Sequence, residues 1–227
     1  MKYALLACDE VAPSFIPEHG TYPEMFQNLL HLDLDVFDVY QNDFPDIKDY
    51  DGFITTGSKQ SVYDPDPWIQ SLIEFTREVF SQGKKFVGIC FGHQLIGQSL
   101  GGRVEKSEEG YLTGVHHFDV YEKPKWMIPK AEDFNILMLC QDQIHHLPEG
   151  AKVLAGSKSC PFGMISMDTH FIGIQGHPEF SKAYNRDVFV SRAEKIGKVK
   201  VDKALLSLDQ EVSREQISGW LRSFLIS

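Results

Sequence analysis

FVGICFGHQ, residues 86–94, is the most informative stretch of the sequence. Residues 86–89 predict a short buried strand, and residues 94–100 predict a helix that stops at a Gly-Gly pair. The cysteine between them, Cys90, has a glycine two residues before it and another two residues after it, which is the layout of a nucleophile elbow. Such a turn strains the backbone and places the thiol at a helix N-terminus, where the helix dipole favours the thiolate. The alternative is a structural cysteine buried in a glycine-rich turn.

A second informative stretch is FIGIQGHPEF, residues 171–180. Its first five residues predict a strand, and Pro178 forces His177 into an extended conformation. Because residues i and i+2 of an extended segment face the same side, His177 and Glu179 can lie next to each other. A carboxylate that orients an imidazole, which in turn deprotonates a thiol, follows the general logic of a catalytic triad. Taken alone, His-Pro-Glu could equally be a turn with a surface ion pair.

The blocks GICFGHQ and IQGHPEF, in that order, resemble the two signature blocks of the class I (triad) glutamine amidotransferase family. The resemblance covers about residues 40–180, and the stand-alone members that include the plant gamma-glutamyl peptidases are more similar still. Three further stretches support it: Tyr50–Ile54, the helix start at Asp66–Ile69, and Leu147–Ala155. The resemblance implies that Cys90 is the nucleophile, that His177 is the general base and that Glu179 orients the imidazole.

The resemblance also implies an oxyanion hole built from two backbone N–H groups. One donor is the N–H of Phe91, directly after the nucleophile, and the other is that of Gly57, after the third predicted strand. Many relatives carry a Gly-Gly pair there, whereas this chain has Thr56-Gly57. Each donor of this kind commonly lowers the activation barrier by a few kcal/mol.

The substrate-binding residues implied by the resemblance are Gln94, Tyr111 and Asp142. Relatives often have a histidine at the position of Cys140 and an acidic residue at that of Gln143, so the contacts on the acceptor side are open. No cofactor is expected. No metal site is expected either, because adjacent histidines in the pairs 116–117 and 145–146 would point to opposite faces of a strand.

The predicted elements indicate an α/β fold. Strands and helices alternate up to residue 102, which implies a parallel sheet with helices on both faces and a reactive site at the carboxyl ends of its strands. Short strands follow from residue 103, at about 114–121, 136–140, 151–157, 162–167 and 171–175, with tail helices at 184–196 and 213–225. We therefore expect one class I glutamine amidotransferase-like (flavodoxin-like) domain over residues 1–227: a mostly parallel sheet with an antiparallel extension. The elbow half is 1–102, and the strand meander and tail helices are 103–227.

Charge and composition exclude several kinds of partner. The 227-residue chain has a formal charge of −10, which argues against nucleic acid and against an anionic membrane surface. Its four cysteines are widely spaced, so a disulfide framework or zinc knuckle is not expected. The apolar run at the N-terminus is short and ends in acidic residues, unlike a secretion signal. A cytoplasmic location is the resulting expectation.

Three functions remain open from the sequence. The first is a stand-alone gamma-glutamyl peptidase that acts on a small-molecule substrate through a glutamyl thioester. The second is a glutaminase subunit that delivers ammonia to a separate synthetase. The third is a non-catalytic binding module on the same fold, against which the presence of Cys90, His177 and Glu179 argues.

Overall fold

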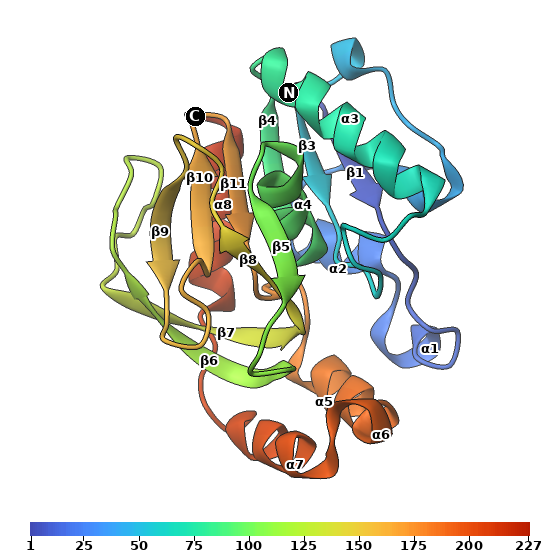
Figure 1. The fold of residues 1–227 in the computed structure, drawn as a ribbon, viewed down its shortest axis with the longest axis vertical. Coiled ribbons are helices and arrows are strands. Elements are labelled where there is room, and N and C mark those ends of the chain that lie inside the picture. Colours follow the sequence, from blue (N-terminus) through green and yellow to red (C-terminus); the bar gives the residue numbers. More distant parts are fainter.

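The computed structural model describes residues 1–227. The elbow half alternates strands and helices (Figure 1). Its elements are β1 (Tyr3–Ala7), α1 (Ile16–His19), α2 (Tyr22–Leu30), β2 (Leu34–Asp38), the 3-10 turns η1 (Val39–Gln41) and η2 (Ile47–Asp49), β3 (Gly52–Thr55), α3 (Pro67–Ser81), β4 (Lys85–Ile89) and α4 (Phe91–Ser99).

Short strands follow, and helices end the chain. These elements are β5 (Arg103–Lys106), β6 (Leu112–Val120), β7 (Asp133–Cys140), β8 (Asp142–His146), β9 (Lys152–Gly156), β10 (Met164–Met167), β11 (Phe171–Ile174), α5 (Lys182–Ser191), α6 (Ala193–Ile196), α7 (Lys198–Ser207) and α8 (Arg214–Leu225). None of the helices combines the length and apolar character needed to cross a bilayer.

Nine strands form one sheet in the order β2-β1-β3-β4-β11-β10-β9-β6-β7. The first five are mutually parallel, and the remaining pairs are antiparallel. This confirms the expected α/β fold with an antiparallel extension. β11, far along the chain, lies parallel to β4 at the centre of the sheet, with Ile174 opposite Ile89. The pairing therefore brings the segment after β11 beside the elbow after β4.

Two apolar clusters sandwich the sheet, because its central strands are buried on both faces. On one face, α2 and α8 contribute Phe26, Leu29, Trp220 and Phe224. On the other face, α3 and α4 contribute side chains such as Leu72. The spacing of the buried residues in α3 and α8 matches the helical period, so each helix presents one apolar stripe to the sheet.

Several predicted elements differ from the observed ones in extent. The segment between β1 and α2 contains the single turn α1, and β2 ends at Asp38 and continues as η1. The predicted tail helix over 184–196 is divided into α5 and α6. The strands β5 and β8, which pair in a separate two-stranded sheet, and the helix α7 were not expected.

Candidate active site

The elbow at Cys90 has the backbone strain that the sequence predicts. Cys90 precedes α4 with φ 52° and ψ −98°, and its N–H donates to the carbonyl of Ile174 over 2.9 Å. A Cβ atom on Gly88 would lie 2.3 Å from the Gly92 carbonyl oxygen, and one on Gly92 would lie 1.6 Å from the Thr55 hydroxyl. Both glycines are therefore required by close packing around the turn.

The segment after β11 places His177 and Glu179 at the same end of the sheet. Their side chains are almost completely buried, and Nδ1 of His177 lies 2.7 Å from Oε1 of Glu179. The imidazole and the carboxylate therefore lie paired in the structure. The His177 N–H donates to the Leu137 carbonyl over 2.8 Å, which ties this segment to β7.

The His177 ring is fixed by packing as well as by hydrogen bonds. It stacks on Phe180 with the ring centroids 4.1 Å apart and an interplanar angle of 4°. Burial lowers the pKa of His177, but negative charge on Cys90 and on Glu179 outweighs it and raises the pKa to about 10. At neutral pH the imidazole therefore holds its second proton.

Gly57 lies against both His177 and Cys90. A Cβ atom at this position would lie 2.9 Å from Cε1 of His177 and 3.7 Å from Cβ of Cys90. The Phe91 N–H is in the first turn of α4, where backbone donors have no partner within the helix. Both predicted oxyanion donors thus flank the Cys90 side chain.

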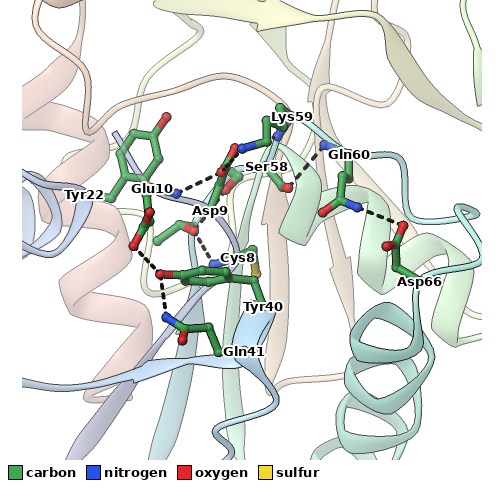
Figure 2. Close-up of polar contacts among 12 residues, drawn as sticks. Cys8, Asp9, Glu10, Tyr22, Tyr40, Gln41, Ser58, Lys59, Gln60 and Asp66 are labelled. Atoms are coloured by element: carbon green, nitrogen blue, oxygen red, sulfur yellow. Dashed lines mark hydrogen bonds and ion pairs between the residues drawn. The ribbon is translucent and has the colours of Figure 1, made fainter. Parts of the chain in front are cut away.

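Side-chain contacts hold the loop after Gly57, as Figure 2 shows. The Asp9 carboxylate accepts hydrogen bonds from the backbone N–H of Lys59 at 3.0 Å and from its Nζ at 2.9 Å. Further along, the Gln60 side chain donates to Asp66 over 2.8 Å. The end of β1 and the start of α3 therefore fix this loop from two sides.

A cavity of about 420 Å³ opens beside Cys90. Gln94, Tyr111 and Asp142, the three predicted substrate-binding residues, all line it. The Gln94 amide donates to the Asp142 carbonyl over 2.8 Å, and the Ser61 hydroxyl donates to the Asp142 carboxylate. The cavity thus offers a fixed amide and a carboxylate next to the thiol.

One residue that the sequence analysis missed is Gln175. Its fully buried side-chain amide points at Cys90, with Nε2 3.6 Å from the sulfur, and its oxygen accepts from Gln94 over 3.3 Å. Gln175 stands two residues before His177 in an extended segment, so the same i, i+2 argument could have identified it. Arg192 and Lys195, which also line the cavity, follow α5 and carry no comparable sequence signal.

Two other histidines lie outside the catalytic arrangement. His93 is buried in α4 beside Gly173, and burial lowers its pKa to about 4. His19 bonds Asp187 over 2.7 Å, and with Glu18 these are the one group of side chains that could hold a metal ion. That group links α1 to α5 and contains none of the predicted site residues, so it is separate from the site around Cys90.

Comparisons with known proteins show the family of this chain. Residues 24–193 match the model of the family "Glutamine amidotransferase class-I". The chain is 33% identical to gamma-glutamyl peptidase 5 of Arabidopsis thaliana, over 99% of this chain and 95% of that protein. It is also 34% identical to the GMP synthase [glutamine-hydrolyzing] of Lactobacillus delbrueckii subsp. bulgaricus, over 60% of this chain but only 26% of that protein.

A solved structure shares the fold. The crystal structure of a glutamine amidotransferase from Thermotoga maritima superposes with a TM-score of 0.77 at 19% identity, covering 99% of this chain and 97% of that one.

Proposed function

This chain belongs to the class I glutamine amidotransferase family, and from that premise we propose that it hydrolyses gamma-glutamyl amide bonds with Cys90 as its nucleophile. The observation that carries the proposal is the pairing of β4 with β11. It places the elbow cysteine beside a buried His177–Glu179 pair whose side-chain atoms lie 2.7 Å apart.

In the proposed mechanism His177 holds the proton of the Cys90 thiol before substrate binds, and the Cys90 thiolate attacks the gamma-carbonyl carbon of the substrate. The backbone N–H groups of Gly57 and Phe91 stabilise the oxyanion of the tetrahedral intermediate. His177 then donates its proton to the departing amine as the C–N bond breaks. Water attacks the resulting thioester with neutral His177 as base, which releases glutamate and restores the Cys90 thiolate and the His177 imidazolium.

Buried charge supports these roles. The pKa of His177, near 10, keeps the imidazole charged at neutral pH, so it has a proton to give to the leaving amine. Glu179 fixes Nδ1 of the ring and leaves Nε2 as the nitrogen for proton exchange. Gln175 donates toward the sulfur and stabilises its negative charge.

For the leaving group we propose an amine or peptide rather than ammonia passed to another protein. The similarity to a gamma-glutamyl peptidase extends over nearly the whole of both chains. The second candidate is a glutaminase subunit that supplies ammonia to a separate synthetase, and the similarity to about a quarter of a GMP synthase favours it. Either candidate uses the same thioester chemistry.

The test is steady-state hydrolysis by the purified chain of glutamine, glutathione and simple gamma-glutamyl dipeptides. Cys90→Ala should abolish turnover, because no other nucleophile lies on the elbow. Cys8→Ala, which alters another buried cysteine outside the cavity, is the matched control and should retain it. Turnover of dipeptides well above glutamine supports a peptidase, whereas turnover of glutamine alone supports the synthetase-linked function. Undiminished activity of Cys90→Ala would overturn the nucleophile assignment.

A further inference from the structure

The cavity beside Cys90 carries unpaired positive charge, although the whole chain has a formal charge of −10. Lys106, Arg192 and Lys195 line it, and none of them forms an ion pair with a carboxylate of this chain. Lys59, which lines the same cavity, is by contrast paired with Asp9 at 2.9 Å. Cations left without partners in a concave site attract an anionic ligand.

Arg192 occupies a special position among these cations. It caps the C-terminus of α5 and is half-buried, and α5 to α7 lie together below the sheet in the view of Figure 1. Arg192 lines the cavity that contains Cys90, and it also lines a small adjoining hollow together with Gly57 and His177. Arg192 therefore lies on the His177 side of the cavity.

The two sides of the cavity serve different parts of a gamma-glutamyl substrate. The leaving amine must lie on the His177 side, because it takes its proton from that imidazole. The glutamyl group must then extend to the opposite side, toward Gln94 and Asp142. That group is a zwitterion with no net charge, so it does not by itself explain three unpaired cations.

We propose that Arg192 recognises a carboxylate on the leaving group, so that the preferred substrates are gamma-glutamyl peptides with a free carboxyl group. This inference rests on the function proposed above and narrows its substrate class. A guanidinium binds a carboxylate through two parallel N–H···O bonds, which gives both strength and direction. The half-buried position of Arg192 reduces the screening of this pair by salt.

The experiment compares gamma-glutamyl-alanine with gamma-glutamyl-alaninamide, which differ only in the charge of the leaving group, and includes glutamine. The wild type should hydrolyse the acid with a kcat/KM about tenfold to hundredfold above that of the amide. Arg192→Gln should reduce this ratio to within about threefold of unity, and Arg192→Lys should restore part of it. Glutamine turnover by Arg192→Gln should fall by a smaller factor than the turnover of gamma-glutamyl-alanine, because ammonia carries no carboxylate. Arg186→Gln, at an exposed position of the same helix, should behave as wild type.

The outcomes separate this inference from the proposed function. Equal rates for the acid and the amide with the wild type would overturn the inference alone, as would a preference that persists in Arg192→Gln. An equal loss of glutamine and dipeptide turnover in Arg192→Gln would also overturn it, since Arg192 would then act on the glutamyl group. No turnover of any of the three compounds by the wild type would overturn the proposed function, and this inference with it.

Discussion

Cys90 occupies a backbone conformation that side chains rarely adopt, with φ 52° and ψ −98°. A conformation of this kind costs about 1–3 kcal/mol and persists only where the surrounding structure enforces it. Here the N–H bond to Ile174 and the tight packing around Gly88 and Gly92 enforce it. The strain keeps the thiol at the start of α4, so the residue most important for the proposed reaction is also unfavourable for folding.

This strain can be measured by comparing two variants that both lack the thiol. Cys90→Gly should have a free energy of unfolding about 1 kcal/mol higher than Cys90→Ala, because glycine adopts positive φ without a Cβ penalty. Urea titrations of the two proteins give the difference directly. Glycine loses more conformational entropy on folding than alanine, so without strain Cys90→Ala would be the more stable variant. A higher stability of Cys90→Ala would therefore show that the native turn is unstrained.

Glu179 controls the protonation of His177. Removing its charge with Glu179→Gln should lower the pKa of His177 from about 10, because one of the two negative neighbours is lost. The pH profile of kcat/KM should decline at alkaline pH, because the imidazolium loses its proton there. In Glu179→Gln this decline should begin at a lower pH. The rate at neutral pH should fall about tenfold to hundredfold, less than in Cys90→Ala. Glu194→Gln, at an exposed position of α6, is the control, and an unchanged profile in Glu179→Gln would remove Glu179 from the triad.

At the scale of elements, the segment that follows β1 holds the loop that follows β3. Asp9 holds Lys59 by two hydrogen bonds, and this loop begins at Gly57, the proposed oxyanion donor (Figure 2). The contact is local in space but joins residues 50 positions apart in the chain. We therefore propose that Asp9 acts as a positioning residue for the oxyanion hole, although it does not touch the reacting atoms.

Asp9→Ala should lower kcat by about tenfold and change KM by less than threefold, because a displaced oxyanion donor weakens only the transition state. The rate of Cys90 alkylation by iodoacetamide should stay the same, since that reaction forms no oxyanion. Asp35→Ala also removes an aspartate that is paired with a lysine, Lys2, and should leave kcat unchanged. A fall in the alkylation rate equal to the fall in kcat would show that Asp9 acts on the thiol instead.

The sequence predicted best the elements with strong local signals. The elbow and the His-Pro-Glu segment combine a strand, a restricted turn and reactive residues at fixed spacing, and the structure brings Cys90, His177 and Glu179 to the same end of the sheet. β5 and β8 were missed because they are short, mixed in polarity and stable only when paired over α4. Arg192 was missed for a similar reason, since its position in the cavity depends on how α5 packs against the sheet.

At the scale of the whole molecule, the buried side chain of His93 should contribute to the pH dependence of stability. Burial lowers the pKa of His93 to about 4 from an ordinary value of 6.5. The unfolded chain therefore binds a proton below pH 6.5 that the native state takes up only near pH 4. The stability linked to His93 is present above pH 6.5 and is lost as the pH falls, up to about 3 kcal/mol.

This loss can be isolated by measuring unfolding free energies of the wild type and His93→Gln between pH 7 and pH 4. The wild type should lose stability more steeply as the pH falls, because only the wild type has the His93 imidazole. The carboxylates that titrate in the same range are common to both proteins, so their contribution cancels in the comparison. His117→Gln, at an exposed position, is the control and should follow the wild type. Parallel curves for His93→Gln and the wild type would contradict the assignment.

The central place of β11 in the sheet has a consequence for biosynthesis. Without β11 the sheet consists of two separate pieces, β2-β1-β3-β4 and β10-β9-β6-β7, each with an open edge. Gln175 and Cys90 are 85 residues apart, so a growing polypeptide carries Cys90 long before it carries His177. Most of the chain, through β11, must therefore be synthesised and emerge from the ribosome before the two pieces can join. Until then both open edges are exposed to aggregation, and chaperones that protect unpaired strands should bind at this stage.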